Sequence, residues 1–465
     1  MKNVVWTSEE INEALSVNLE EGLQAGQVHF NSKLVKKDDI FIALPGITRD
    51  GHEFVEDALK NGARLVIVSK KIPHEQQSKF VFVQNTLEAL DALASYKKAR
   101  CNAKIIAITG SVGKTSTKQA LDATLQTYGK TYASPASFNN HLGVRLSFAS
   151  IANDTKYVVI EMGMNAAGEI DKLSKFVKPD ISVITSIDKA HIGFFASVED
   201  IADAKCEIFN YLSPREGIAI VNADMTMLPK CKKYLLKKGI SKVITFGNDK
   251  SANVRILKVQ HKTDLTFNVK YKIFDEILEL NSKIIPPSFI YNFACVLSVL
   301  KSLNLNIKEE NINPLKIFEP SIGRGKIVDI DNGIDKYLII SDYYNSNPKS
   351  LSAALEYLSL IKHDKKVAII GDMKELGQFE SQLHFQMVEP ILKSGIKKLF
   401  LVGDAMGAIS SSFKDKIKTY KFADTEELSS SVKSYLDGGE LILIKGSRGA
   451  KLERIAECLG VKDAL

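Results

Sequence analysis

The sequence predicts an α/β protein with two or three domains built around mostly parallel sheets. Its 465 residues are too many for a single hydrophobic core. Apolar segments without polar alternation are separated by helical segments, which is typical of parallel strands covered by helices on both faces. Turns with Gly, Asp or Ser follow these segments. Because the carboxyl ends of strands carry the ligand site in open α/β sheets, we expect the function to reside in these turns.

The composition limits the classes of partner. The chain is 45% hydrophobic and 25% charged, as is ordinary for a globular protein, and its net charge of +7 is mild and dispersed. An anionic small substrate accounts for that charge as well as a nucleic acid would, and we expect no nucleic-acid partner. Five scattered cysteines without metal-ligand spacing predict reduced thiols and a cytoplasmic location. No apolar run approaches the roughly 18 residues that cross a bilayer, so we expect no membrane insertion.

The N-terminal domain is expected to span residues 1–98. The opening "MKNVVWTSEEINEAL" predicts a capped helix and lacks the apolar core of a signal peptide. Strands are expected at 39–46 and 63–69, and the polar stretch 95–104 predicts a linker.

The central domain, 99–316, is expected to contain a parallel sheet. Its apolar strands are predicted at 105–109, 157–163 and 181–186, with a helix near 198–211. From 242 to 284 the pattern alternates with period two, which predicts an antiparallel extension, and a helix follows near 289–303.

The C-terminal domain, 317–465, repeats the alternation of strands and helices. Each predicted strand ends in a turn with Gly, Asp or Ser. The predicted strands are 337–342, 366–372, 398–404 and 440–447.

A phosphate-binding turn is predicted in "AITGSVGKTSTKQAL" (107–121). The pattern G-x-x-G-K-T follows a strand and precedes a helix, although Ile108 stands where the strict Walker A motif has glycine. Converging N–H groups, a lysine and a Mg²⁺-binding threonine hydroxyl suit a triphosphate better than the alternative, a chance glycine-rich turn. ATP is favoured over GTP because no Asn-Lys-x-Asp motif follows a strand. The residues expected at the phosphates are Gly110, Ser111, Val112, Gly113, Lys114, Thr115 and Ser116.

Two further side chains could serve a Mg²⁺-phosphate site. Glu161 ends the strand in "YVVIEMG" and is favoured as a ligand over a helix cap. His191 in "AHIGFF" follows the next strand, and the residues alone favour a ligand and a structural histidine equally.

Nine motifs, in order along nearly the whole chain, resemble those of the Mur ligases, ATP-dependent amide-forming enzymes of peptidoglycan precursor synthesis. This resemblance implies a central P-loop ATPase domain flanked by an N-terminal α/β UDP-substrate domain and a C-terminal Rossmann-like domain. The nine motifs are "ITGSVGKTSTK", "SFNNHLGV", "EMGMNAAGEI", "AHIGFF", "DAKCEIF", "GRGK", "SDYYNSNPKSLSAAL", "GDMKELG" and "KGSRGAKLE", and the N-terminal "ALPGITRDGHEFVEDALKNGA" matches the family too.

Within the family, "YNSNP", "GDMKELG" and "KGSR" are similar to the members that join D-alanyl-D-alanine to a UDP-N-acetylmuramoyl-tripeptide. The members that add the preceding diamino acid carry Asp-Asn-Pro-Arg, which this chain lacks. Two alternatives stay open: a diamino-acid-adding ligase, and a nucleic-acid-stimulated P-loop ATPase. The resemblance also implies ATP and Mg²⁺ as cofactors, and we expect a monomer.

The resemblance implies roles for the catalytic residues. Lys114 would contact the β- and γ-phosphates, Thr115 and Glu161 would hold one Mg²⁺, and His191 would help to hold a second. Lys205 matches a lysine that is carbamylated in the family, whereas the residues alone favour a solvated lysine on an amphipathic helix.

The resemblance also implies the ligand-binding residues. Those expected at adenine and ribose are Asn292, Arg324, Asp342 and Tyr344. Those expected at the muramoyl-peptide, the dipeptide or the phosphates are Asn139, Asn140, Asn345, Asn347, Lys445, Ser447 and Arg448, although the turn at 345–347 would also suit a simple helix cap.

The residues expected at the uridine diphosphate are Ser32, Lys33, Asp50, Gly51 and His52, with Arg49 beside them. Several positions depart from the family pattern. Asn31 and Lys33 replace Asp and Arg, Ser137 replaces Asn, and Arg145 replaces Pro. Lysine keeps the charge at position 33 but lacks the planar fork for bidentate contact with a diphosphate.

Overall fold

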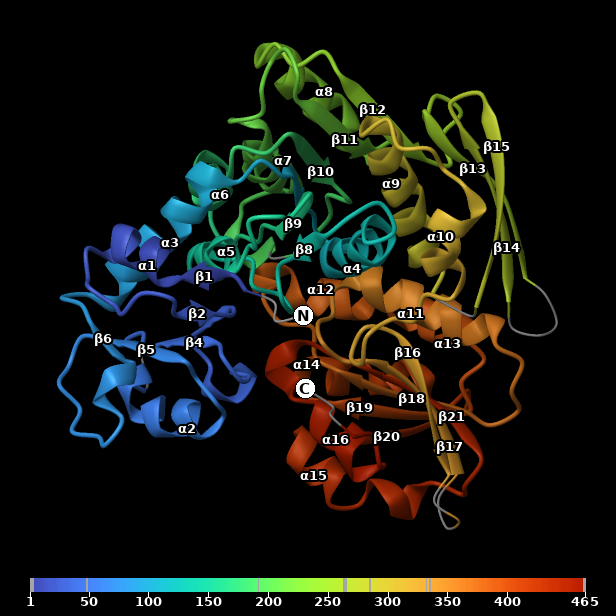
Figure 1. The fold of residues 1–465 in the computed structure, drawn as a ribbon. Helices are drawn as coiled ribbons and strands as arrows, with labels where there is room; N and C mark the ends of the chain where they lie inside the picture. The colour runs from blue at the N-terminus through green and yellow to red at the C-terminus, as the bar shows by residue number, and fades with distance from the viewer. Residues whose placement is uncertain are drawn as a thin grey trace.

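The computed structural model describes residues 4–46, 49–190, 192–261, 266–283, 286–331, 333 and 336–462. Within them, three main β-sheets follow one another along the chain, each with helices on its faces (Figure 1). The three-domain α/β class expected from the sequence is therefore confirmed.

The N-terminal sheet is parallel and has the described strands in the order β3-β4-β5-β6, beside a small antiparallel pair β1-β2. Helix α1 begins with the expected cap: the Thr7 side chain accepts the N–H of Glu10, and the Glu10 carboxylate accepts the N–H of Thr7. Elements labelled η are 3₁₀ helices. The elements are β1 (Trp6–Thr7), α1 (Ser8–Leu15), β2 (Gln24–Ala25), β3 (Val28–His29), η1 (Ser32–Leu34), β4 (Ile40–Ile42), η2 (Gly51–Phe54), α2 (Val55–Lys60), β5 (Leu65–Val68), η3 (Gln77–Lys79), β6 (Phe80–Phe82) and α3 (Thr86–Arg100).

The linker predicted at 95–104 is wrong. Helix α3 continues to Arg100 and strand β7 starts at Lys104, so only three residues separate them. The polar composition misleads because Lys97, on this last part of the helix, is 2% exposed and faces the domain junction.

The central sheet has its described strands in the order β15-β14-β13-β12-β11-β10-β7-β9-β8. Alternate residues of β7 enter different cores. Ile106 and Ile108 lie in one core with residues of α4 and α9, whereas Ile105 and Ala107 lie in another with residues of α5 and α6. The elements are β7 (Lys104–Thr109), α4 (Lys114–Leu125), β8 (Thr131–Ala133), α5 (His141–Ala149), β9 (Tyr157–Glu161), α6 (Glu169–Val177), β10 (Ile181–Ile184), η4 (Ile192–Phe194), α7 (Val198–Cys206), η5 (Glu207–Phe209), β11 (Ile218–Asn222), α8 (Leu228–Lys237), β12 (Val243–Gly247), β13 (Val254–His261), β14 (Phe267–Ile273), β15 (Glu276–Ser282), α9 (Ser288–Ser302) and α10 (Glu309–Lys316).

The antiparallel extension predicted for 242–284 is present in β13, β14 and β15. Strand β12, however, pairs parallel to β11. Helix α8 connects these two strands, and a crossover through a helix keeps neighbouring strands parallel.

The C-terminal sheet has the order β16-β17-β21-β18-β19-β20, and within the described residues only β16 pairs antiparallel. Helices α11, α12 and α13 lie on the side of this sheet that faces the central domain (Figure 1). The elements are β16 (Lys326–Asp331), β17 (Lys336–Asp342), α11 (Pro348–Leu360), β18 (Lys366–Gly371), η6 (Gly377–Phe379), α12 (Glu380–Phe385), α13 (Val388–Lys393), β19 (Lys398–Val402), α14 (Asp404–Ala408), η7 (Ser410–Phe413), β20 (Lys418–Phe422), α15 (Thr425–Ser429), η8 (Val432–Tyr435), β21 (Glu440–Lys445), η9 (Arg448–Ala450) and α16 (Glu453–Cys458).

No helix in the described part of the chain is both long and apolar enough to cross a membrane.

The junction between the N-terminal and central domains is polar and buried. The Lys97 ammonium lies 3.0 Å from Glu10 Oε2 and 2.9 Å from Asn153 Oδ1, and it also donates to the Val5 carbonyl. It lies 4.4 Å from the ring centroid of Trp6, whose indole N–H donates to the Ala149 carbonyl at 2.7 Å. Lys97 thus connects the first strand, the first helix and a loop of the central domain.

We expect Lys97→Met to lower the free energy of unfolding of this junction by about 3 kcal/mol, because it leaves the partly buried Glu10 carboxylate without its cation. Trp6 is the only tryptophan, so its fluorescence during urea unfolding reports on the junction. Lys104→Met is the control. Lys104 pairs with Asp180 but is 60% exposed, so its loss should cost less than about 1 kcal/mol. Equal shifts of the urea unfolding midpoint in Lys97→Met and Lys104→Met would contradict this account of the junction.

Candidate active site

The predicted phosphate-binding turn connects β7 to α4, and two positions in it require glycine. Gly113, the N-cap of α4, has a φ of 88°, and a Cβ there would lie 2.8 Å from Asn292 Oδ1. At Gly110, φ is 152° and a Cβ would lie 2.0 Å from Thr185 Oγ1. The turn is thus packed against both α9 and the end of β10, and side chains at these positions would displace it.

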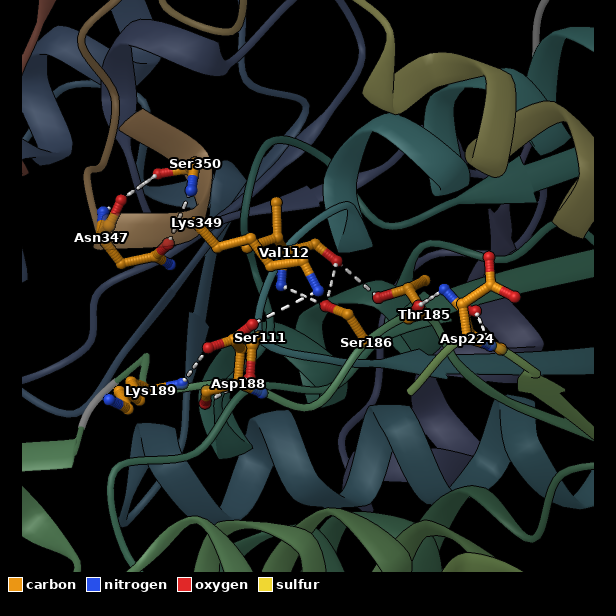
Figure 2. Close-up of polar contacts among 11 residues, drawn as sticks. Ser111, Val112, Thr185, Ser186, Asp188, Lys189, Asp224, Asn347, Lys349 and Ser350 are labelled. Atoms are coloured by element: carbon orange, nitrogen blue, oxygen red, sulfur yellow. Dashed lines mark hydrogen bonds and ion pairs between the residues drawn. The ribbon is translucent and has the colours of Figure 1, made fainter. Parts of the chain in front are cut away.

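Residues after β10 hold the turn in shape (Figure 2). The N–H of Ser111 donates to the Ser186 carbonyl at 2.8 Å, and the N–H of Val112 donates to Ser186 Oγ at 2.9 Å. Thr185 Oγ1 donates to the Val112 carbonyl at 2.6 Å, and Ser111 Oγ donates to the Asp188 carbonyl at 3.0 Å. Thr185 and Ser186 were not predicted from the sequence. The sequence feature that could have indicated them is a pair of hydroxyl side chains directly after β10, the strand that pairs with β7.

Lys114 is half-buried, and its ammonium donates to the Gly110 carbonyl at 2.8 Å. Burial lowers the pKa of Lys114, and the nearby Arg324 cation lowers it further, whereas the Glu161 carboxylate opposes the shift. The cation therefore lies over the phosphate turn and within the electrostatic reach of the predicted metal ligand.

Glu161 ends β9 and is 1% exposed. Thr115 Oγ1 donates to its Oε2 at 2.8 Å, and Asn139 Nδ2 donates to its Oε1 at 2.8 Å. The Lys118 ammonium lies 3.6 Å from Oε2. Lys118 was not predicted, although it follows Lys114 by four residues and so shares its face of α4.

These residues fit a Mg²⁺ site of the kind that substrate phosphates complete. Mg²⁺ is commonly bound by one or two carboxylates together with phosphate oxygens and waters. The described residues contain no group of three His, Cys, Asp or Glu side chains that would hold a metal by themselves. They do place the Glu161 carboxylate in contact with the Thr115 hydroxyl, and both are hard oxygen donors. His191 lies outside the described residues.

Lys205 is not a solvated surface lysine. It lies on α7 and is 2% exposed. Burial holds the pKa of its amine well below the ordinary range, and the Lys114 cation lowers it further. Lys205 therefore lies close enough to the phosphate turn to interact electrostatically with it.

Arg324 extends from the C-terminal domain toward this site. Its Nη2 donates to Ser137 Oγ of the central domain at 2.8 Å, and its guanidinium lies 3.9 Å from the ring centroid of Tyr344. Arg448 also approaches this ring, at 5.3 Å. Burial lowers the pKa of Arg324, and the Glu161 carboxylate is the largest influence opposing that shift. Arg324 and Tyr344, both expected at the nucleotide, therefore lie together at the domain boundary.

Asp342 and Lys445 form an ion pair at the ends of β17 and β21, with 3.0 Å between Oδ2 and Nζ. Burial raises the pKa of Asp342, and Lys445 opposes that shift. The Lys445 ammonium is 1% exposed and also donates to the carbonyls of Asp342 and Asn345 at 3.2 and 2.7 Å. All three of its protons are thus used within the domain, so here Lys445 holds the turn after β17.

The asparagines of the predicted substrate site mostly have local partners. Asn347 caps α11 by accepting the N–H of Ser350 at 2.9 Å, as the simpler interpretation of this turn expected. Asn140 caps α5 by accepting the N–H of Gly143 at 2.9 Å. Asn345 Oδ1 accepts the N–H of Ser346.

One contact joins α11 to the phosphate turn, and another lies within the C-terminal domain. Lys349 of α11 lies 3.3 Å from Asp188, in the segment that shapes the phosphate turn (Figure 2). Ser447, two residues after the end of β21, accepts the N–H of Lys374 at 2.8 Å.

The residues expected at the uridine diphosphate follow β3 and β4, which are parallel neighbours, so their carboxyl ends share one edge of the N-terminal sheet. Asp50 accepts from His52 Nδ1 at 2.6 Å and pairs with Lys70, which together hold the pKa of Asp50 well below its usual range. Gly51 is required because a Cβ would lie 2.5 Å from the Leu44 carbonyl. Ser32 is buried in η1, and the Lys33 side chain is exposed.

Comparison with family models assigns each of the three domains. Residues 26–98 match "Mur ligase family, catalytic domain", residues 108–300 match "Mur ligase middle domain", and residues 323–448 match "Mur ligase, glutamate ligase domain".

Curated relatives match over nearly the whole chain. A UDP-N-acetylmuramoyl-tripeptide–D-alanyl-D-alanine ligase from Rickettsia prowazekii is 40% identical over 98% of this chain and 99% of its own length. The enzyme of the same name from Bacillus subtilis is 31% identical over 92% of each chain.

Solved structures share the arrangement of the domains. A crystal structure of MurF from Acinetobacter baumannii aligns with a TM-score of 0.78 at 24% identity, covering 99% of this chain and 100% of that one. The MurF ligase from Thermotoga maritima in complex with ADP aligns with a TM-score of 0.75 at 25% identity, covering 95% and 98%. The family resemblance of the nine motifs is thus confirmed, and the chain belongs to the Mur ligase family.

Proposed function

We propose that this protein joins D-alanyl-D-alanine to a UDP-N-acetylmuramoyl-tripeptide at the expense of ATP, in peptidoglycan precursor synthesis. The observation that carries the proposal is the meeting of two domains at one phosphate site: the turn at 110–113 and Glu161 from the central domain, and Arg324 from the C-terminal domain. The full-length relatives from Rickettsia and Bacillus, which carry this activity in their names, support it.

The chemistry must overcome a poor electrophile, because an ionised carboxylate resists attack by an amine. In the proposed reaction a carboxylate oxygen of the tripeptide attacks the γ-phosphorus of ATP and ADP leaves. The dipeptide amine then attacks the acyl carbon, inorganic phosphate leaves, and the amine loses its proton. The work of the protein is to neutralise charge and to align three substrates.

The residues take distinct roles in this scheme. The turn N–H groups and Lys114 bind the phosphates, and Arg324 adds a second cation from the opposite domain. Thr115 and Glu161 would hold Mg²⁺, with His191 and a carbamylated Lys205 at a second ion. Bound Mg²⁺ would supply further neutralisation of the phosphate oxygens. Asn139 donates to Glu161 and so orients it.

The other predicted residues are assigned by ligand. Asn292, Asp342 and Tyr344 bind adenosine, and Ser447 and Arg448 bind the dipeptide carboxylate. The residues around Ser32 and Asp50–His52 bind the uridine diphosphate. We place the domain boundaries near residues 98 and 316. We also propose that the protein acts as a monomer in the cytoplasm, where ATP and UDP-activated precursors are available.

The reaction is tested by measuring ADP release with each amine in turn. We expect turnover only when the UDP-tripeptide, D-alanyl-D-alanine and Mg²⁺ are all present. Turnover with a UDP-dipeptide and lysine or diaminopimelate would assign the preceding step in the series instead. Turnover without any amine, or stimulated by a polynucleotide, would contradict both.

Lys114→Ala should abolish amide formation while leaving the circular dichroism spectrum and the unfolding midpoint unchanged, because the half-buried ammonium neutralises phosphate and does not support the core.

A matched pair of glycine substitutions tests the turn itself. Gly113 and Gly168 both precede helices, with φ of 88° and 83°, so alanine should strain the backbone of each by about 1 kcal/mol. A Cβ at Gly168 meets open space, whereas one at Gly113 meets Asn292. We expect Gly113→Ala to weaken ATP affinity at least about tenfold, a loss of 1.4 kcal/mol, and Gly168→Ala to leave it within about twofold. Calorimetric titration with a non-hydrolysable ATP analogue measures both, and equal affinities would contradict the proposed nucleotide site.

Carbamylation of Lys205 has its own spectroscopic test. The neutral amine attacks CO₂ to form a carbamate and releases a proton, so the lowered pKa favours the reaction at neutral pH. With ¹³C-bicarbonate, we expect a carbamate resonance in the ¹³C NMR spectrum that weakens as the pH falls and the amine is protonated. Lys205→Met should remove the resonance, and Lys97→Met, which replaces another buried lysine, should retain it. A resonance retained in Lys205→Met would contradict the assignment.

A further inference from the structure

The turn 371–377, which follows β18 and contains "GDMKELG", contacts the central domain through main-chain atoms. The N–H of Gly193 in η4 donates to the Glu375 carbonyl at 2.8 Å. A Cβ at Gly193 would lie 2.8 Å from both the Glu375 carbonyl oxygen and the Gly377 nitrogen. A Cβ at Gly377 would lie 2.9 Å from the Gly193 Cα. The two domains therefore meet here backbone against backbone, without room for a side chain at either glycine.

One residue of this turn, Glu375, adopts a backbone conformation that a non-glycine residue does not favour. Glu375 has a φ of 63° and Gly377 a φ of 53°. A glutamate in this left-handed region is uncommon and persists only where surrounding contacts impose it. One such contact comes from Asp372 Oδ1, which accepts the N–H of Met406 at 2.8 Å, and another from the Lys374 N–H, which donates to Ser447 Oγ at 2.8 Å.

A third contact comes from His384, on α12. Its Nε2 accepts the N–H of Met373 at 3.0 Å, and its Nδ1 lies 2.7 Å from the Glu380 carbonyl. A backbone N–H only donates and a carbonyl only accepts, so these partners assign the neutral tautomer with the proton on Nδ1. The side chain is 0% exposed. With both nitrogens occupied, His384 has no free atom with which to contact a substrate.

We propose that His384 is a positioning residue for the ligation reaction: its imidazole fixes the 371–377 turn against Gly193, and so sets the orientation of the C-terminal domain over the phosphate site. The proposal rests on the proposed function for its kinetic consequences. The same turn supports Ser447 through Lys374, and Ser447 belongs to the proposed dipeptide site. Release of Met373 therefore affects the dipeptide and the closure of the domains, whereas the turn at 110–113, which binds the nucleotide, remains intact.

Two substitutions of the same residue separate the two nitrogen contacts. In His384→Gln the side-chain carbonyl reaches the place of Nε2 and accepts the Met373 N–H. In His384→Asn the shorter amide reaches only the place of Nδ1, so it donates to the Glu380 carbonyl and leaves the Met373 N–H without an acceptor. Both variants replace the imidazole ring with a polar amide. They differ in whether the Met373 N–H keeps an acceptor.

We expect His384→Asn to raise the KM for D-alanyl-D-alanine about tenfold and to lower kcat, the effect of one buried donor left unpaired. The Kd of a non-hydrolysable ATP analogue should rise by a smaller factor than this KM, because the turn at 110–113 and Lys114 stay in place and only the nucleotide contacts of the C-terminal domain shift. His384→Gln should restore the KM for the dipeptide to within about threefold of wild type. Gly377→Ala leaves His384 in place but pushes a Cβ against Gly193, and it should reproduce the KM effect, which keeps the proposal testable should His384→Asn fail to fold.

Hydrogen exchange provides a measurement independent of the reaction. In His384→Asn the amides of the peptides containing Gly193 and Met373 should exchange faster than in wild type, and in His384→Gln they should not. Unchanged exchange at Gly193 in His384→Asn would overturn the proposal, as would equal loss of activity and stability in the Gln and Asn variants. If the wild-type protein forms no amide with the dipeptide, the proposed function fails, and the exchange data still decide whether His384 holds the turn.

Discussion

The site depends on an imbalance of charge in a place that water reaches poorly. Lys114, Lys118 and Arg324 all interact with the carboxylate of Glu161, and burial lowers the pKa of each of these cations. Asp122 also acts on Lys118 and Asp342 on Arg324, but Asp342 is already paired with Lys445. Cations held out of water with too little negative charge around them favour a multivalent anion. A triphosphate offers that charge, and its oxygens suit both the ammonium groups and the N–H groups of the turn. Binding a triphosphate here would therefore relieve the repulsion among these cations.

The same imbalance links the site to the arrangement of the domains. Lys114 and Lys118 come from the central domain, whereas Arg324 comes from the C-terminal domain and reaches across to Ser137. Lys349 and Asp188 pair across the same boundary. A triphosphate bound between these groups would attract both domains, so its binding would favour their contact and their contact would favour its binding.

Much of this was predictable from local sequence, because a phosphate turn is built from adjacent residues. The glycines at 110 and 113, Lys114, Thr115 and the strand-end position of Glu161 follow from spacing along the chain. Residues that contact the site from distant segments of the chain could not be predicted from local sequence. Ser186 shapes the turn across 74 residues of sequence, and His384 was not singled out beside the motif it supports. The linker at 95–104 failed for a related reason: composition shows that Lys97 is polar, but not that Glu10 and Asn153, from distant segments, accept its hydrogen bonds.

The contact of Gly193 with Gly377 limits how substitutions can change the angle between the central and C-terminal domains. Where two domains meet through side chains, a substitution on one surface can be answered by a substitution on the other, and the angle between the domains can drift. Here main-chain atoms form the contact on both sides, so a substitution on one side cannot be compensated by a side chain on the other. At this contact a compensating pair of side-chain substitutions is therefore not available, and a different angle between the domains requires a loop of different shape.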